Sequence, residues 1–210
     1  MTFSSRAQAG EKLGEHLRRT KLAVDLVIGL PRGGVVVAAE VARVLQRPLA
    51  ALVVRKIGHP RHREFAVGAL AEDGTVLLDE DAVQRTGVGA DELREVVAEE
   101  TARLESYRKK FHPHGPPQYE GKSVLIVDDG LATGATTEAA VRSAKQQGAT
   151  RVIVAVPVAS DSAMERLQRV ADQVIALHVD PEFDAVGRYY RSFPQNTDEE
   201  VVALLEQNAW

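Results

Sequence analysis

Apolar and polar positions along the chain predict buried strands separated by helices. Strands that are covered on both faces lack the apolar–polar alternation of half-exposed strands, so short apolar runs indicate a buried parallel sheet. The expected strands lie at 24–30, 49–57, 124–127, 151–159 and 173–179. Strand patterns that alternate with helix patterns in this way predict an α/β fold with a parallel sheet flanked by helices.

The segments between the strands predict helices and one irregular insertion. Helices are expected at 5–20, 33–45, 90–111, 136–148 and 161–170. The helix at 90–111, inserted between the second and third parallel strands, has acidic residues early and a basic run late, as the helix dipole favours. The segment 65–78 predicts two short strands around the turn signal Asp73-Gly74, and 58–64 predicts a basic loop.

Composition narrows the class of protein. The 210 residues are 44% hydrophobic and 27% charged, which suffices for a core without metal or disulfide staples. The absence of cysteine excludes disulfides, thiolate catalysis and Cys-type zinc sites, and it fits a cytoplasmic protein. A formal net charge of −4 argues against a nucleic acid partner, and the lack of a long apolar run argues against a membrane partner.

The C-terminal segment is richer in aromatic residues than the rest of the chain and holds the only Trp. We expect a core over residues 1–179 and a smaller unit over 180–210. This unit is expected to be a loop-rich cap that ends in a helix N-capped by Thr197.

Two glycine-rich segments follow predicted strands, "GLPRGG" at 29–34 and "DDGLATGATT" at 128–137. In doubly wound folds, ligands bind at the C-terminal ends of the strands. The small residues and threonines of the second segment, at the start of a helix, form a plausible phosphate cradle. Asp128 and Asp129 would repel a phosphate and suit sugar hydroxyls or Mg²⁺ instead. Phosphate beside a diol describes a ribose 5-phosphate.

Other interpretations of these loops are weaker. A P-loop needs a Lys after its second glycine, and the spacing of "GLPRGG" does not match a dinucleotide fingerprint. Two acids after a strand also occur in phosphoacceptor domains, but there they stand near the start of a small domain. A tight turn is the remaining structural alternative.

The stretch "VLIVDDGLATGATT" at 124–137 resembles the phosphoribosyl-pyrophosphate (PRPP) motif of the type I phosphoribosyltransferase family. The resemblance implies a Rossmann-like core with a C-terminal hood over 180–210. It implies that Asp128 and Asp129 hold the ribose hydroxyls. It also implies that the 5′-phosphate is bound, mainly through backbone amides, by Ala132, Thr133, Gly134, Ala135, Thr136 and Thr137.

The resemblance extends to pyrophosphate binding. "LPRGG" is similar to the family's pyrophosphate loop, in which a peptide is often strained or cis, and the candidate bond here is Pro31–Arg32. A basic residue after the second strand also serves pyrophosphate, and ordinary solvated charge is its alternative. The implied pyrophosphate residues are Pro31, Arg32, Gly33, Gly34, Arg55 and Lys56, and the implied catalytic set is Asp128, Asp129, Arg32 and Lys56.

The segment "PEFDAVGRYY" resembles the hood that covers the base in purine-type members. Phe183 is the best candidate to stack on a base, and a C-terminal mini-core is the alternative. Ala132 stands where enzymes acting on 6-oxopurines place an Asp. The hoods of those 6-oxopurine enzymes also carry an acid shortly after the Val-Gly pair, and this chain has Arg188 and Arg191 instead. Hypoxanthine or guanine salvage is therefore not expected, whereas adenine stays open.

The chain thus resembles a bacterial group of stand-alone phosphoribosyltransferases of unassigned substrate. The implied reaction is transfer of a 5-phosphoribosyl group from PRPP to a nitrogen nucleophile, a nucleobase in the first instance, with release of pyrophosphate. Mg²⁺ is the expected cofactor, bound through PRPP and not by a protein metal site. The alternative is a non-catalytic regulator that binds PRPP or a nucleotide. The oligomeric state is open, with a homodimer as one option.

Overall fold

The computed structural model describes residues 1–112 and 115–208, so small parts of the expected core and hood, at 113–114 and 209–210, lie outside the described residues. A parallel five-stranded sheet forms the centre, in the order β2-β1-β6-β7-β8. Its strands are β1 (Leu26–Gly29), β2 (Leu49–Ala51), β6 (Ser123–Val127), β7 (Arg151–Ser160) and β8 (Gln173–Asp180). The predicted α/β fold is confirmed.

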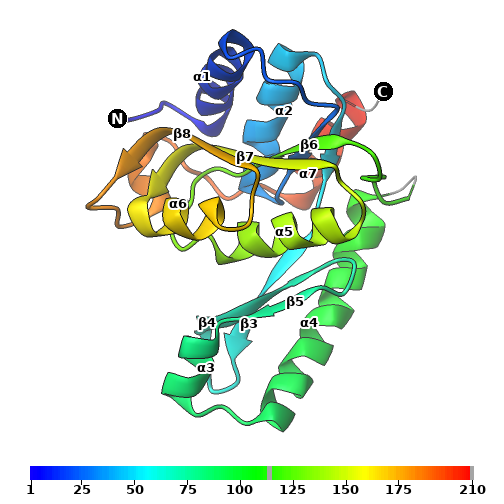
Figure 1. The fold of residues 1–210 in the computed structure, drawn as a ribbon, viewed down its shortest axis with the longest axis vertical. Helices are drawn as coiled ribbons and strands as arrows, with labels where there is room; N and C mark the ends of the chain where they lie inside the picture. The colour runs from blue at the N-terminus through cyan, green and yellow to red at the C-terminus, as the bar shows by residue number, and fades with distance from the viewer. Residues whose placement is uncertain (113–114, 209–210) are drawn as a thin grey trace.

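Helices cover both faces of this sheet. In Figure 1, α1 (Arg6–Arg19) and α2 (Gly33–Leu45) lie above it, and α5 (Ala135–Gln146) and α6 (Asp161–Gln168) lie below. The central strands β1 and β6 are buried along almost their whole length, because apolar side chains from both helical layers pack against them. Because the strands run parallel, the loops that follow them lie at one edge of the sheet.

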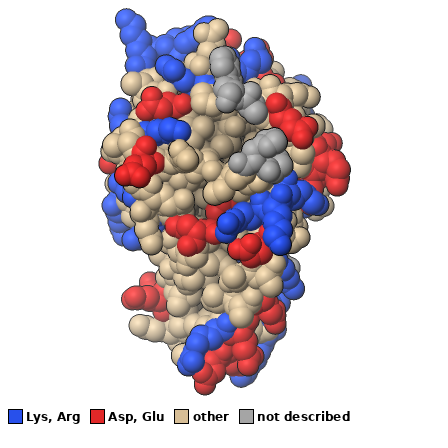
Figure 2. Space-filling view, turned by 90° about the vertical axis from the view of Figure 1, so that its right-hand side faces the viewer, with Lys and Arg blue, Asp and Glu red and all other residues tan. Residues whose placement is uncertain are grey.

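The part of the chain between β2 and β6 forms a second unit, which extends away from the parallel sheet (Figure 1). It is a three-stranded antiparallel sheet in the order β3-β4-β5, joined to two helices. Its elements are β3 (Val54–His59), β4 (His62–Ala71), β5 (Val76–Leu78), α3 (Glu80–Thr86) and α4 (Ala90–Phe111). The side that carries α4 shows acidic and basic side chains mixed over its surface (Figure 2). Some of the charged residues of α4 form ion pairs one helical turn apart, such as Arg108–Glu105 at 3.3 Å.

The structure corrects two expectations for this unit and adds one helix. The run 49–57 forms two strands in two different sheets, because the chain leaves the parallel sheet after Ala51. Between the two strands, the N–H of Val53 donates to the carboxylate of Glu72 at 3.0 Å. The segment 58–64 is mostly strand, since β3 and β4 pair as far as His59 and His62. The helix α3 was not anticipated.

The N-terminal and C-terminal segments meet beside the sheet. Phe3 forms a parallel bridge with Tyr190, just after a short 3-10 helix, η1 (Val186–Tyr189). The last helix, α7 (Asp198–Gln207), packs against α2 and α4 and begins at the predicted N-cap, where Thr197 accepts from the N–H of Glu200. No helix among the described residues is long and apolar enough to cross a membrane.

Candidate active site

The two acids of the PRPP-like motif stand at the C-terminal end of β6, against the loop that follows β1. A Cβ atom at Gly34 would lie 2.7 Å from Oδ1 of Asp128, and one at Gly33 would overlap Oδ2 of Asp129. Any side chain at either glycine would therefore push the acids out of place. The structure thus brings the two glycine-rich loops into direct contact, although 94 residues separate Gly34 from Asp128.

A buried arginine from the N-terminal helix joins this contact. Arg6 Nε donates to Asp129 Oδ2 at 2.7 Å, and the side chains are only 10% and 16% exposed. Arg6 Nη1 donates to the carbonyl of Pro194 at 2.7 Å, and its guanidinium lies 3.6 Å from the ring centre of Phe193. Tyr190 donates its hydroxyl to the carbonyl oxygen of Asp129 at 2.6 Å. Contacts from α1 and from the C-terminal segment therefore hold Asp129 in place.

Burial is the largest influence on the pKa of both acids. Burial and the nearby charge of Asp129 raise the pKa of Asp128 well above its ordinary value, and hydrogen bonds from the Asp129 N–H and Thr137 oppose this. Burial also raises the pKa of Asp129 above its ordinary value, and the hydrogen bond and charge of Arg6 reduce this shift without reversing it. Burial raises the pKa of the Tyr190 phenol, so this group stays a hydrogen-bond donor.

The loop after the acids is held by the end of β7. Leu131 bridges Ala159, with hydrogen bonds of 2.9 Å on either side, and Ser160 donates its hydroxyl to the carbonyl of Ala132 at 2.6 Å. The helix α5 starts at Ala135, and its first backbone hydrogen bond runs from the N–H of Glu138 to the carbonyl of Gly134 at 2.8 Å. The first N–H groups of a helix have no carbonyl partner within it, so those at the start of α5 are suited to an anion.

The predicted phosphate residues are not equally accessible. Ala132 and Thr133 are exposed, whereas Gly134 and Thr137 are buried. The Thr137 side chain faces Asp128, so this residue can serve a phosphate through its backbone only.

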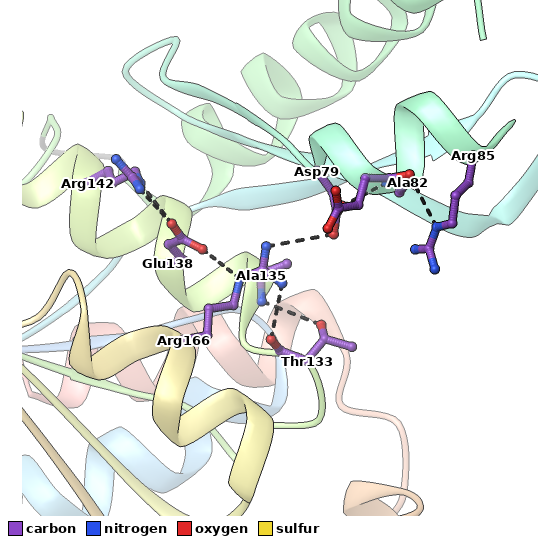
Figure 3. Close-up of polar contacts among 9 residues, drawn as sticks. Asp79, Ala82, Arg85, Thr133, Ala135, Glu138, Arg142 and Arg166 are labelled. Carbon is purple, nitrogen blue, oxygen red and sulfur yellow. Dashed lines mark hydrogen bonds and ion pairs between the residues drawn. The ribbon is translucent and has the colours of Figure 1, made fainter. Parts of the chain in front are cut away.

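A charged network supports the phosphate-loop side of α5 (Figure 3). The buried carboxylate of Glu138 accepts from Arg142 on the same helix at 2.8 and 3.0 Å, and from Arg166 of α6 at 2.6 Å. Arg166 also reaches the carbonyl of Thr133 at 3.5 Å and lies 3.8 Å from Asp79 in the inserted unit. Arg166 thus connects the loop, both helices below the sheet and the start of α3.

The loop that follows β1 lines a cavity. The peptide between Pro31 and Arg32 is cis. A cavity of about 300 Å³ lies beside it, lined by Pro31, Arg32, Arg55 and Tyr107 among others. The Arg32 side chain is nearly half exposed and approaches Asp198 at 3.9 Å. The predicted pyrophosphate residues Pro31 and Arg32 therefore share one cavity with Arg55.

Of the two basic residues near the start of β3, Arg55 lines both this cavity and a neighbouring one, and Lys56 lines the neighbouring one. Arg55 is held by Glu100 of α4 at 2.9 Å, with Tyr107 beside its guanidinium at 5.4 Å. Lys56 is exposed and lines a neighbouring cavity of about 410 Å³, together with Arg55 and Arg63.

The basic turn between β3 and β4 is tied to α4. Arg61 pairs with Glu92 at 3.1 Å, and Arg63 pairs with Glu99 at 2.8 Å. In Figure 1 this turn lies at the far end of the inserted unit from the parallel sheet. In this structure it does not cover the loop after β1.

The hood candidates pack against one another. Phe183 stacks on Tyr189 with ring centres 5.2 Å apart, and Tyr189 donates to Asp180 at 2.7 Å. Val186 packs on the phosphate loop, since a Cβ at Gly130 would lie 2.8 Å from it. Phe183 is half-buried and belongs to a small apolar cluster that includes Phe3.

Sequence reasoning missed the residues that support the site. Arg6 stands 123 positions before its partner, and nothing in an amphipathic helix distinguishes it from the exposed arginines Arg18 and Arg19. Glu138 carried a weak signal as an acid in the first turn of a helix, but its partner Arg166 lies on another element.

Comparison with known proteins agrees with this geometry. The family model described as "Phosphoribosyl transferase domain" matches residues 4–186. Rv0571c of Mycobacterium tuberculosis (strain ATCC 25618 / H37Rv), whose name assigns it provisionally to the phosphoribosyl transferases, is 42% identical over 207 residues. The match covers 98% of this chain but 46% of Rv0571c, so the chain spans about half the length of that relative.

Solved structures give the same result. TT1426 from Thermus thermophilus is 43% identical and superposes with a TM-score of 0.84, with 100% of both chains covered. A purine phosphoribosyltransferase from Pyrococcus horikoshii Ot3 shares the fold, with a TM-score of 0.50 and 19% identity over 90% of each chain. The family match over most of the chain, together with the close relative, shows that this protein belongs to the phosphoribosyl transferase domain family.

Proposed function

We propose that the protein transfers the 5-phosphoribosyl group of PRPP to a nitrogen acceptor, a nucleobase in the first instance, and releases pyrophosphate. One observation carries the proposal: the acids after β6 are packed against Gly33 and Gly34 of the loop with the cis peptide. A ribose held by Asp128 and Asp129 would then lie beside a pyrophosphate held by that loop. In this proposal residues 1–179 form the catalytic core and 180–210 the hood.

Each predicted residue has a role in this scheme. The amides at the start of α5 bind the 5′-phosphate, because a helix N-terminus favours an anion. Arg32 and Arg55, which share a cavity, neutralise the pyrophosphate, and Lys56 approaches it from the adjacent cavity. Phe183 stacks on the acceptor base.

Mg²⁺ enters this scheme on the substrate. No group of three or more His, Cys, Asp or Glu side chains within 1–112 and 115–208 could hold a metal ion. We propose that oxygens of PRPP hold the ion. When bound, Mg²⁺ supplies positive charge to the departing pyrophosphate.

The chemical step needs positioning more than covalent chemistry. The bond between ribose C1 and the pyrophosphate oxygen breaks, and both of its electrons leave with pyrophosphate. The lone pair of the acceptor nitrogen forms the new bond to C1 from the opposite face, and the proton displaced from that nitrogen passes to water. The protein fixes the ribose and stabilises the leaving charge, and these effects account for large rate enhancements elsewhere.

Calorimetric titration with PRPP, with and without Mg²⁺, tests the binding step. We expect binding that depends on Mg²⁺ and is weakened in Asp128→Asn, because the amide loses one acceptor oxygen. Asp161→Asn is the matched control, since Asp161 is exposed on α6. No detectable binding with Mg²⁺ present would overturn the proposal, and unchanged affinity in Asp128→Asn would overturn the ribose assignment.

A second candidate function is a non-catalytic regulator that binds PRPP or a nucleotide. It is favoured by Ala132, which leaves the exposed base side of the loop without an acid. Release of pyrophosphate from saturated protein, screened against adenine, other nucleobases and ammonia, separates the two. Pyrophosphate release with any acceptor supports the transferase, and tight binding without release across the panel supports the regulator.

A further inference from the structure

Arg6 is the cation that the structure pairs with the acidic couple, and it comes from a helix outside both ligand-binding loops. We propose that Arg6 is a positioning residue that holds Asp129 ionised and oriented for the ribose. This inference rests on the proposed function, because it assigns the purpose of Asp129 to ribose binding. It adds α1 to the elements that build the site.

The geometry fixes the guanidinium on three sides. Nε bonds the carboxylate of Asp129, Nη1 bonds the carbonyl of Pro194, and the ring of Phe193 covers the flat face at 3.6 Å. A guanidinium can satisfy such a set because its donors are rigid and planar, whereas an ammonium offers one point of charge. An arginine that served only solubility would not be 10% exposed.

The charges around Asp129 explain why it needs a partner. Asp128 is the next residue, and its like charge disfavours a second negative charge. Tyr190, from the C-terminal segment, donates to the carbonyl of Asp129 and not to the carboxylate. Gly33 packs against the Asp129 carboxylate and carries no charged side chain. Arg6 from α1 is thus the group whose hydrogen bond and charge oppose the effect of burial on the Asp129 carboxylate.

Removal of Arg6 should therefore change affinity and its pH dependence together. Without the guanidinium, Asp129 takes up a proton at higher pH, so the acid-side loss of PRPP binding moves to higher pH. Lysine keeps the charge but loses the second hydrogen bond, so Arg6→Lys should restore the pH profile in part. A residue with a structural role alone would change stability without moving the pH profile.

The experiment compares Arg6→Met, Arg6→Lys and a matched control, Arg18→Met, which removes an exposed arginine from the same helix. The dissociation constant for PRPP with Mg²⁺ is measured by calorimetry from about pH 5 to about pH 9. Relative to Arg18→Met, Arg6→Met should bind PRPP about 10- to 100-fold more weakly at neutral pH, the range for losing a hydrogen bond to a charged group. Affinity and pH profile equal to those of the control would overturn the proposal.

A second measurement needs no ligand. The ¹³C resonance of the Asp129 carboxyl is followed against pH in the wild type, Arg6→Lys and Arg18→Met, and also in Arg6→Met if that variant folds. We expect the titration of Asp129 to move to higher pH when Arg6 is replaced by Met, and by less for Lys. If the wild type fails to bind PRPP, the proposed function falls, and the resonance still decides whether Arg6 controls Asp129. An Asp129 titration that is the same in Arg6→Lys and the control would overturn the inference.

Discussion

Substitution of Glu138 by Gln should destabilise the protein through the charged network beside the phosphate loop. The Glu138 side chain is 8% exposed and lies between two guanidiniums, Arg142 and Arg166 (Figure 3). Glutamine has nearly the same shape but no charge, and its amide NH₂ would face one of the arginines. The change therefore removes the ionic interactions and leaves the apolar packing in place.

The magnitude follows from the hydrogen bonds that the substitution weakens. A hydrogen bond to a charged group contributes about 1.5–3 kcal/mol, and Glu138 accepts bonds from two arginines. Arg142 and Arg166 are 48% and 30% exposed, so both can be rehydrated, which reduces the cost. We expect a loss of about 2–3 kcal/mol in the free energy of unfolding. For a chain of this size, that corresponds to a fall in Tm of about 4–12 °C.

The effect should depend on pH with a definite sign. Burial raises the pKa of Glu138, but the hydrogen bonds and charges of Arg166 and Arg142 outweigh it, so the pKa is lowered below its ordinary value. A carboxyl with a lowered pKa in the folded state contributes its full stability above the unfolded-state pKa, about 4.5. The contribution is lost as the pH falls through the folded-state pKa. The wild type and Glu138→Gln should therefore differ most near neutral pH and converge in acid.

Calorimetric melting and urea unfolding at neutral and acidic pH measure this difference. Glu165→Gln is the matched control, because Glu165 is an exposed acid of α6, and such surface changes usually stay within about 0.5 kcal/mol. The reasoning is refuted if Glu138→Gln is as stable as Glu165→Gln at neutral pH. It is also refuted if the deficit of Glu138→Gln grows as the solution is acidified.

Three further substitutions test the site directly. Gly34→Ala places a methyl group 2.7 Å from Asp128, so it should cost about 1–3 kcal/mol in urea unfolding and weaken PRPP binding, and unchanged affinity would contradict the contact between the loops. Tyr190→Phe removes the bond to the carbonyl of Asp129 and should cost about 1 kcal/mol, whereas a variant of wild-type stability would show that this bond contributes nothing. Phe183→Ala should raise the KM for the acceptor without changing PRPP affinity, and equal changes in both would argue against a role in base stacking.

Local patterns in the sequence suffice to predict the parallel sheet and the positions of the two glycine-rich loops that follow β1 and β6. The apolar run ending at Val127 is followed at once by the acids and the small residues, so strand, site and helix start can be identified within one stretch. The long helix at 90–111 was likewise predictable, because its charge pattern fits a helix over its whole length.

The remaining features depend on contacts between distant segments. The run 49–57 is apolar without interruption from Leu49 to Val54, so its composition does not reveal that the chain changes sheets between Ala51 and Val54. The basic segment 58–64 forms strands because β3 and β4 pair through their backbones, and this needs no apolar side chain. Arg6 could not be assigned a role from sequence, since its partner Asp129 is brought to it by the folded sheet.

The meeting of the N-terminal and C-terminal segments has a consequence for biosynthesis. Arg6 and the Pro194 carbonyl that it bonds are 188 residues apart in the sequence. A ribosome makes the N-terminal end first, so Arg6 emerges long before Pro194 is added. A nascent chain that stops short of Tyr190 lacks the Tyr190 hydroxyl, the Phe193 ring and the Pro194 carbonyl, and with them the C-terminal contacts to Asp129 and Arg6. These contacts can therefore form only after the last part of the chain has been made.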